Sequence, residues 1–508
     1  MQKESFMNKE EKSSNKCPIC GRPTHKKSEY CIFHASAEEK TEEELKKALK
    51  EYIQEIKEEG KDYDFEGFIF VGNINFKEDL NIIVFKKANF RNATFKGEAD
   101  FKGATFERDA DFKGATFKQY ANFTGATFEG DANFTGATFE GKAGFWKTTF
   151  KQYAYFTRAI FKRETDFYKN TFKQYAYFTS ATFEENANFW STTFMGKADF
   201  KGATFEGGAG LGATFKGDAD FSIKAIGEYI SFYNALFNQG RTLVIKTTDV
   251  KNEVTIDFEK VCLENVYLEL FLGEKTLINF TNALIRSTVI KKSQIENHIL
   301  QEEKKEFSKA KEVYLLLKNN FHSIGRYEDE SWAFTKEKDM ERFSHSFPCY
   351  KEAFKKDSKI EKFPILKWIK KGYFKKWIIS AFSNMIYGYG EKPWNVIKTA
   401  VAIILIFALS FSFIGLGNPE IIELKGTAIH QNSGNTVDLE SKGLLKNNVI
   451  RNFPDSLYFS TITFTTLGYG DFRPLEGLGR ILAGSEAFLG AIMMALFVYT
   501  FARRTGGR

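Results

Sequence analysis

The sequence predicts a multidomain protein in which a β-solenoid precedes a membrane domain of two helices, with a small metal-binding knuckle at the N-terminus. Three observations predict this class. Phenylalanine recurs at a strict short period, two long apolar stretches lie near the C-terminus, and cysteine and histidine occur in ligand-like pairs near the start. With 55 phenylalanines in 508 residues, the chain is too aromatic for a disordered protein. A mean hydropathy of −0.35 excludes a polytopic transporter but leaves room for a few spans.

Residues 1–36 contain four potential metal ligands in the pattern C-x2-C-x10-C-x2-H. Two such pairs joined by a short loop suit tetrahedral Zn²⁺, and because protein fills all four positions, the site would be structural. The alternative is a chance grouping of these residues in a polar terminus. The predicted zinc ligands are Cys17, Cys20, Cys31 and His34.

Residues 37–64 form a predicted connector helix. Thr41 and Glu44 have the spacing of a capping box, apolar residues then recur at helical spacing, and Gly60 is placed to end the helix.

The solenoid is predicted from residues 95–221, which hold 23 phenylalanines. From Phe95 to Phe205 the gaps alternate strictly between six and five residues, and alanines recur beside them. A helix of period 3.6 cannot place such residues on one face, whereas a coil with four short sides can. The ladder consists of Phe95, Phe101, Phe106, Phe112, Phe117, Phe123, Phe128, Phe134, Phe139, Phe145, Phe150, Phe156, Phe161, Phe167, Phe172, Phe178, Phe183, Phe189, Phe194, Phe200 and Phe205.

The repeated unit A-[DN]-F-x-G-A-T-F-x-x-x resembles the pentapeptide-repeat family, with one extra residue in every second unit. The resemblance implies a right-handed quadrilateral β-helix with about 22 residues per coil, hence about six coils over the regular ladder. The pattern frays where Leu211 replaces a phenylalanine, so residues 65–295 are predicted as the β-helix with irregular C-terminal coils.

Two helical segments separate the solenoid from the membrane domain. Residues 296–345 have the spacing of a helical hairpin. Residues 346–393 interleave lysines with aromatic side chains, which predicts a basic amphipathic segment on an anionic inner leaflet of the lipid bilayer. An ordinary surface helix is the alternative for this segment.

Residues 394–508 form the predicted membrane domain. Trp394–Leu416 and Leu478–Ala502 are each long and apolar enough to span a bilayer. Seven Lys/Arg residues in 361–392 and three after the second span outweigh four in the loop 418–452. This bias predicts a multi-pass protein of the cell membrane, with two spans and with both termini in the cytoplasm. Neither span carries a regular arginine ladder, so no voltage sensor is expected.

Between the spans, residues 453–464 are too short to cross, and the next seven resemble the selectivity filter of potassium channels, T-x-G-Y-G-D. The resemblance implies a homotetramer in which rings of backbone carbonyls bind K⁺. Glycine permits the backbone conformations that turn successive carbonyls inward. A second GYG, at 388–390, lacks a preceding pore helix and is predicted as a turn. The predicted K⁺-binding filter is Thr465, Thr466, Leu467, Gly468, Tyr469, Gly470 and Asp471.

The second span holds the predicted gate. Gly490 lies where the family's inner-helix hinge glycine falls, with Gly484 as a second candidate, and either glycine could instead serve close helix packing. Glu486 either faces the cavity and concentrates cations or forms a hydrogen bond behind the filter. Met494 and Val498 are expected to line the gate.

Together these features predict a K⁺-selective channel with a cytoplasmic pentapeptide-repeat domain of regulatory or scaffolding role, open to a cytoplasmic protein or ligand. No enzyme is predicted, because P-loop, nucleophile–base and Rossmann patterns are missing from the sequence. Nucleic acid is not expected as a partner, since residues 95–221 carry 16 basic and 16 acidic side chains. The alternative is a membrane-anchored protein-binding scaffold with a non-selective or non-conducting pore.

Overall fold

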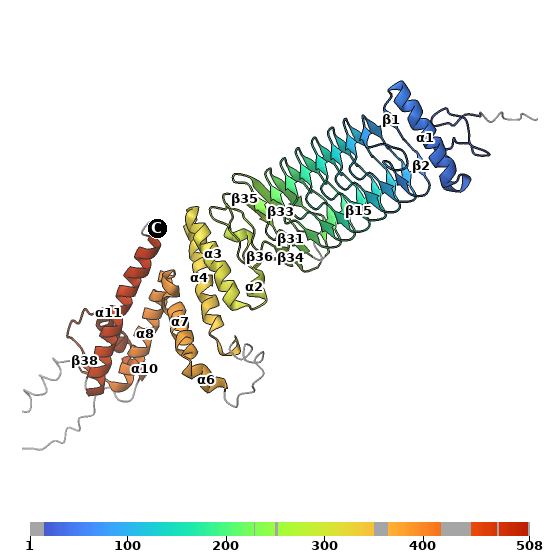
Figure 1. Ribbon diagram of the computed structural model, residues 1–508. Coiled ribbons are helices and arrows are strands. Elements are labelled where there is room, and N and C mark those ends of the chain that lie inside the picture. Colours follow the sequence, from blue (N-terminus) through green and yellow to red (C-terminus); the bar gives the residue numbers. More distant parts are fainter. Residues whose placement is uncertain are drawn as a thin grey trace, which may run out of the picture. The chain divides into compact units, whose positions relative to one another are not determined.

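The computed structural model describes residues 15–227, 229–248, 252–349, 364–417, 449–474 and 477–505 (Figure 1). The chain forms two compact units, Met1–Ala333 and Phe334–Arg508. The first unit holds the solenoid and its two ends. The second holds the two membrane-length helices. Residues 418–448 lie outside the described residues. They are most of the loop whose Lys and Arg residues were counted to predict the orientation of the two spans.

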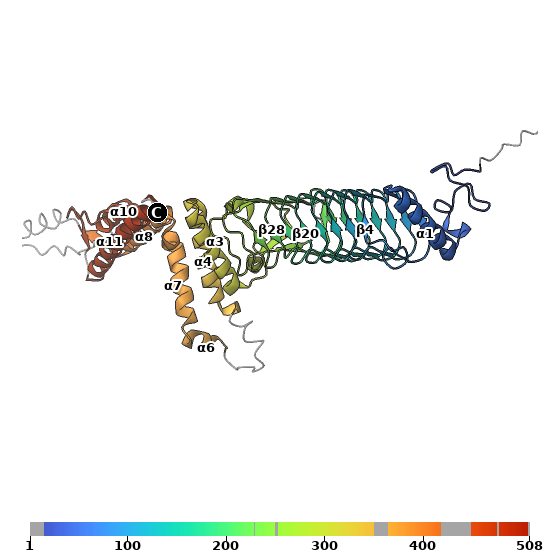
Figure 2. The ribbon, with the colours of Figure 1, turned by 45° about the horizontal axis from the view of Figure 1, so that its top comes forward.

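The first unit is a four-sided parallel β-solenoid, which confirms the predicted fold class (Figures 1 and 2). It has about ten turns. Most strands pair with the strand four places along the chain. For example, Phe117 is in register with Phe139, twenty-two residues later. The last pairs are only two or three strands apart, namely β31 (Tyr229–Ser231) with β34 (Val254–Asp257), β33 (Thr242–Lys246) with β35, and β34 with β36. The four sheets run from β1 (Tyr63–Asp64) to β35 (Tyr267–Phe271), from β2 (Ile69–Phe70) to β30 (Ala225–Ile226), from β3 (Ile74–Asn75) to β36 (Thr276–Asn279), and from β4 (Val84–Phe85) to β32 (Leu236–Phe237).

Stacked phenylalanine rings fill the solenoid. The Phe95 and Phe117 centroids lie 4.8 Å apart with an interplanar angle of 1°, and Phe139 continues the same column. Both rings of each such pair are buried. Parallel strands spaced by roughly 4.7–4.9 Å set this ring spacing, so every coil buries its aromatic side chains against the coils above and below.

The ladder begins earlier than the predicted start at Phe95. Phe70 stacks on Phe95 at 4.5 Å, and Phe65 stacks on Phe90 at 4.7 Å. A turn over residues 76–80 lengthens the first coil, and this breaks the six–five spacing on which the prediction depended. The estimate of about six coils therefore covered only the regular part of the solenoid.

The N-terminal end of the solenoid is covered by η1 (Ala37–Glu39), α1 (Glu42–Glu59) and the segment before them. Thr41 and Glu44 form the predicted capping box, and Gly60 ends α1 with a φ of 66°. Leu49 and Ile53 of α1 are buried. This apolar side shields the first coil from water.

The C-terminal end is covered by η2 (Lys292–Gln294), α2 (Leu300–Glu303) and α3 (Phe307–Ser323). Asn320 of α3 exchanges hydrogen bonds with both backbone groups of Thr288, at 2.8 and 2.9 Å. The unpaired edges of the last coils are thus satisfied by helices, which limits edge-to-edge pairing with other chains.

Helix α4 (Tyr327–Ser344) begins in the first unit and ends in the second. The second unit continues with α6 (Pro364–Lys370), α7 (Tyr373–Tyr387), η3 (Gly388–Gly390), α8 (Pro393–Ile414), β37 (Leu416–Gly417), α10 (Val449–Phe464), β38 (Arg473–Pro474) and α11 (Gly477–Thr505). Two of these helices, Pro393–Ile414 and Gly477–Arg504, are long and apolar enough to cross a membrane. Strands β37 and β38 pair antiparallel at one end of the helices.

Candidate functional site

The predicted filter follows directly after helix α10, which lies between α8 and α11 in the chain and packs against both. The amide of Leu467 donates to the Ile462 carbonyl at 2.9 Å, so the chain turns sharply at the end of α10. Phe459 of α10 packs edge-on against Phe411 of α8, with centroids 4.9 Å apart. Helix α10 is therefore fixed by the two long helices and presents the filter at its C-terminal end.

The filter backbone alternates in conformation. Thr466, Gly468 and Gly470 have φ values of 59°, 50° and 80°, whereas the residues between them do not have positive φ. Alternation of left- and right-handed residues turns successive carbonyls toward one side of the strand. Glycine adopts positive φ readily, but a β-branched residue does so only under strain. Thr466 is therefore a strained position, which the glycines alone did not indicate.

The filter side chains are exposed in the isolated chain. Leu467 and Tyr469 are 61% and 69% exposed, and a Cβ on Gly468 or Gly470 would meet no atom within 4 Å. Among the described residues, the hydrogen bonds that join the filter to a helix all go to α10, as in the hydrogen bond from Thr465 Oγ1 to the Thr461 carbonyl at 2.8 Å.

Gly490 of α11 packs directly beneath the filter. A Cβ at this position would overlap the carbonyl oxygen of Phe464, the last residue of α10. A Cβ on Gly484 would meet nothing within 4 Å. Of the two glycines named for the gate, Gly490 is the one that close packing of α11 against α10 requires, and α11 runs through it as one helix. Its role as a hinge stays a prediction.

Glu486 of α11 is fully buried and lies against α10. Its Oε1 forms a hydrogen bond with the hydroxyl of Ser460, and that hydroxyl also lies 2.9 Å from the Ile404 carbonyl oxygen of α8. The Oε2 atom has no hydrogen-bond partner among the described residues. Of the two alternatives that the sequence left open, this geometry corresponds to the one in which Glu486 bonds behind the filter.

Further along α11, the side chains divide between packing and exposure. Met493 is buried in a cluster with Val396 and Phe464. Met494 and Val498, the two predicted gate residues, are 55% and 63% exposed. They belong to the part of the α11 surface that α8 and α10 leave uncovered.

The C-terminal end of α11 is joined to the 388–390 turn. Arg503 forms an ion pair with Glu391 (Nη2 to Oε1, 3.1 Å) and donates to the Tyr389 carbonyl at 3.5 Å. The guanidinium also lies over the ring of Phe334 of α4, 4.6 Å from its centroid. The Glu391 side chain is only 3% exposed, so the ion pair is largely withdrawn from water.

Asp339 of α4 extends this group of contacts. Its carboxylate accepts from Arg342 at 2.9 Å, from Asn384 of α7 at 3.1 Å and from the Tyr389 hydroxyl at 3.3 Å. Burial raises the pKa of Tyr389, and the nearby Asp339 charge acts in the same direction. One residue of the 388–390 turn thus contacts α4 through its side chain and α11 through its carbonyl.

This contact group was missed in the sequence. Arg503 and Glu391 are more than a hundred residues apart, and no periodicity or spacing joins them. The sequence feature that could have indicated these contacts is the second GYG, which the sequence predicts only as a turn. The structure does show a turn there, with Tyr389 at a φ of 58°, but the turn is buried and fully engaged.

The four predicted metal ligands do come together. The Sγ and Nδ1 atoms of Cys17, Cys20, Cys31 and His34 all lie within 4.8 Å of one another. The Cys31 Sγ to His34 Nδ1 distance is 3.2 Å and the Cys20 to Cys31 Sγ distance is 3.5 Å. Tetrahedral zinc ligands at about 2.0–2.3 Å from the metal lie roughly 3.5 Å apart, so the cluster matches such a site.

The orientation of His34 also fits a metal ligand. Its Nε2 lies 2.8 Å from the Glu66 carbonyl oxygen, which accepts a hydrogen bond from it and leaves Nδ1 free of hydrogen, facing the thiols. Phe33 stacks on Phe68 of the first coil at 4.5 Å. The cluster therefore packs directly against the first coil of the solenoid.

Comparison with known proteins agrees with this arrangement. Residues 420–506 match a family model described as "Ion channel", and residues 83–127, 123–169 and 171–212 match one described as "Pentapeptide repeats (9 copies)". No solved structure matches the chain.

Three curated relatives illustrate the similarity. Protein LctB of Bacillus caldotenax is 31% identical over 108 residues, 21% of this chain and 68% of that protein. Potassium voltage-gated channel subfamily KQT member 4 of Homo sapiens is 48% identical over 50 residues, 10% of this chain and 7% of that protein. Two pore potassium channel a of Oryza sativa subsp. japonica is 46% identical over 44 residues, 9% of this chain and 13% of its own length. The chain thus belongs to the ion-channel family and joins a C-terminal channel domain to an N-terminal pentapeptide-repeat solenoid.

Proposed function

We propose that this chain is the subunit of a homotetrameric, K⁺-selective channel of the cell membrane. The observation that carries the proposal is the filter, Thr465–Asp471, set at the end of a short helix between two membrane-length helices. Its alternating φ values suit a strand whose carbonyls all face one axis. Backbone carbonyls arranged in rings replace the water shell of a dehydrated K⁺ ion. Thr466 would add its hydroxyl at the inner end.

Fourfold assembly would supply what the isolated chain lacks. The exposed Leu467 and Tyr469 side chains, together with Met494 and Val498 on α11, are large apolar or aromatic groups without cover in their own chain. Around a central axis, the first pair would brace the filter and the second pair would line the inner pore. The half-charge at the C-terminal end of α10 would favour a cation beneath the filter.

The termini are proposed to be cytoplasmic. Seven Lys/Arg residues precede α8 and three follow the hydrophobic part of α11, in the distribution that the positive-inside rule associates with the cytoplasm. The pentapeptide-repeat solenoid would then lie in the cytoplasm and act on the pore. The contacts of Asp339, Tyr389 and Arg503 support such coupling, because they link α4, which emerges from the solenoid unit, to the end of α11.

The test is ion flux through purified protein in liposomes. K⁺ or Tl⁺ should enter far faster than Na⁺, and the Tyr469→Ala variant should reduce that ratio without loss of the oligomer. Equal K⁺ and Na⁺ flux through the unmutated protein would overturn K⁺ selectivity. Absence of any flux from an assembled tetramer would favour a membrane-anchored scaffold instead.

The N-terminal cluster is proposed to hold structural Zn²⁺. Three thiolates and one imidazole fill a tetrahedral shell, so no position is open for catalysis. The metal would lock residues 17–34 onto the first coil. Purified protein should contain one zinc per chain, and Cys31→Ser should abolish it and lower the melting temperature of the solenoid, leaving K⁺ selectivity unchanged. Zinc-free protein with unaltered melting would contradict the assignment.

A further inference from the structure

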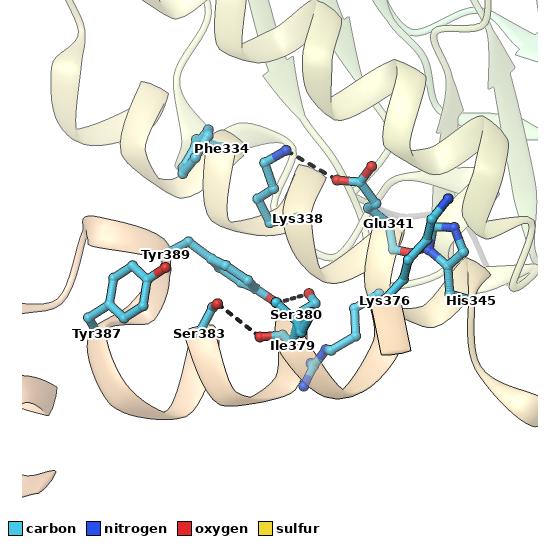
Figure 3. A pocket seen from close by; sticks show the side chains of 11 residues that line it. Phe334, Lys338, Glu341, His345, Lys376, Ile379, Ser380, Ser383, Tyr387 and Tyr389 are labelled. Atoms are coloured by element: carbon cyan, nitrogen blue, oxygen red, sulfur yellow. Dashed lines mark hydrogen bonds and ion pairs between the residues drawn. The ribbon is translucent and has the colours of Figure 1, made fainter. Parts of the chain in front are cut away.

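A cavity of about 450 Å³ lies between the end of α4 and helix α7, within the second unit (Figure 3). Its volume falls in the range of about 300–1,000 Å³ typical of small-molecule sites. We refer to it as the α4–α7 cavity. Nothing in the proposed conduction mechanism requires it, since it is separate from the filter.

The walls of the α4–α7 cavity carry more positive than negative charge. Lys338, Arg342 and Lys376 line it, against the single carboxylate of Glu341. Glu341 is neutralised by Lys338 at 3.1 Å. The Lys376 side chain is exposed, and its ammonium forms no hydrogen bond or ion pair in the part of the chain that the structure describes. The cavity therefore holds a cation that no carboxylate of the described protein balances.

One further donor faces an incomplete environment. The Nε of Arg342 is buried without a hydrogen-bond partner among the described residues, although its Nη2 pairs with Asp339. His345 also lines the cavity and lies on the same side as Lys376 in Figure 3, with its Nδ1 2.8 Å from the Glu341 carbonyl oxygen. A buried donor without an acceptor costs about 1–3 kcal/mol, so an acceptor in the cavity would be favoured.

Hydroxyl groups also line the cavity. Ser380 and Ser383 come from α7, the helix that carries Lys376, and Tyr387 and Tyr389 follow them (Figure 3). Ser380 shares a hydrogen bond of 3.1 Å with the Tyr389 hydroxyl. Cations and hydroxyls in one cavity suit a ligand that combines an anion with a polyol.

We propose that the α4–α7 cavity binds a glycerol phosphate group, carried by an anionic lipid headgroup or by a soluble organic phosphate, and that its binding alters channel opening. The phosphate oxygens would be met by Lys376 and Arg342, and the glycerol hydroxyls by Ser380 and Ser383. Three oxygens with a negative charge satisfy several donors at once, which a chloride ion cannot do.

The effect on opening rests on the proposed channel function. Tyr389 lines the cavity through its ring and hydroxyl, and its carbonyl accepts from Arg503 at the end of α11. A ligand that pulls Arg342 or Ser380 toward itself competes with the bonds that hold Tyr389. The position of the turn, and with it the end of the pore-lining helix, would then depend on occupancy.

The experiment separates binding from conduction. Full-length protein in nanodiscs of phosphatidylcholine, with or without phosphatidylglycerol, is tested for retained lipid by native mass spectrometry. The same protein in phosphatidylcholine alone is titrated with glycerol 3-phosphate by calorimetry. K⁺ flux is measured in matching liposomes. We expect one anionic ligand per chain to bind and to change K⁺ flux severalfold.

A neighbouring lysine supplies the matched control. Lys376→Ala should weaken binding about tenfold and remove the flux response, while basal K⁺ flux in phosphatidylcholine persists. Lys375→Ala removes an equally exposed charge from the same helix, outside the cavity, and should change binding less than twofold.

The outcomes are distinct. Retention of phosphatidylglycerol alone identifies a lipid headgroup, and binding of glycerol 3-phosphate alone identifies a soluble ligand. Binding of neither, or equal losses with Lys375→Ala and Lys376→Ala, overturns the site. Binding without any change in flux overturns the regulatory part. Basal K⁺ selectivity, measured without ligand, reports separately on the channel function.

Discussion

The chain contains the tripeptide Gly-Tyr-Gly twice, and the two copies have opposite surroundings. Gly388, Tyr389 and Gly390 are buried, with φ values of 56°, 58° and 93°, and Tyr389 is 8% exposed. In the filter copy, Gly468 and Gly470 have φ values of 50° and 80°, and Tyr469 is 69% exposed. Both copies use glycine for positive φ, but among the described residues the tyrosine of the first copy is packed and that of the second is exposed.

The comparison shows that this tripeptide does not determine a function by itself. The first copy follows helix α7 and forms hydrogen bonds with Asp339 of α4 and Arg503 of α11. It therefore connects these two helices and serves a structural role. The second copy follows α10, and its tyrosine side chain is largely exposed. Position after a short helix, between two membrane-length helices, distinguishes a filter from a turn.

The largest difference between the two GYG copies is expected when the first glycine of each is replaced by alanine. Gly468→Ala should abolish K⁺ over Na⁺ selectivity, because the methyl group disfavours the left-handed backbone on which the carbonyl alignment depends. Gly388→Ala meets only the flexible side chain of Lys392, so the protein should stay selective and lose about 1–2 kcal/mol of stability. Tl⁺ and Na⁺ flux assays on both variants check this. Selective flux through Gly468→Ala would remove the distinction between the copies.

The support beneath the filter comes next in size. Gly490→Ala places a methyl group against the Phe464 carbonyl and should cost about 1–3 kcal/mol, seen as a lower melting temperature of the tetramer together with reduced selectivity. Gly484→Ala, on the same helix with open space around it, should behave as the unmutated protein. A Gly490→Ala channel that is stable and selective but rarely open would favour a hinge over packing.

A smaller effect, on channel opening alone, is expected from loss of the Arg503–Glu391 ion pair. Arg503→Gln removes the cation of the ion pair with the buried Glu391 and should cost about 1–3 kcal/mol, which shifts the open probability. Selectivity should be unchanged, because the filter is not involved. Single-channel recordings of Arg503→Gln, Glu391→Gln and the double variant form the cycle. Strict additivity of the three shifts would show that the two residues do not act as a pair.

The smallest effect concerns pH. Burial raises the pKa of Tyr389 above its ordinary value, so the phenol stays neutral in both folded and unfolded states below about pH 9. Its proton can therefore contribute no pH dependence to stability in that range. Tyr389→Phe removes bonds worth about 0.5–1.5 kcal/mol, and the ratio of its K⁺ flux to that of the unmutated protein should be the same at pH 6.5 and 8.5. A ratio that changes between those values would contradict a neutral Tyr389.

Local and repeated features of the molecule were predictable from the sequence. The six–five phenylalanine spacing predicts a four-sided coil because each inward side chain must recur once per side. The paired spacings of Cys17, Cys20, Cys31 and His34 predict a cluster because each pair lies within one turn of chain. Both predictions depend on neighbours within a few dozen residues, which the sequence displays directly.

Features that depend on distant partners were not predictable. The side of α11 that Glu486 faces follows from its contact with Ser460 of α10, and α11 is apolar nearly all round, so no stripe marks its buried side. The number of coils was underestimated because one lengthened turn shifts the spacing between Phe76 and Phe85, before the regular ladder that begins at Phe95. The ion pair between Arg503 and Glu391 joins two segments at opposite ends of the membrane domain in the sequence. Neither local sequence indicates which residue its charged side chain contacts.

The solenoid has a consequence for how this protein can change over generations. The regular coils present the same strand edges and the same stacked rings to their neighbours, so one of them can be removed or copied without altering what the adjoining coils contact. In-frame duplication or loss of a coil-length gene segment would therefore lengthen or shorten the repeat domain while both covered ends and the pore stay as they are. Selection can adjust the reach of this domain in whole coils, independently of conduction.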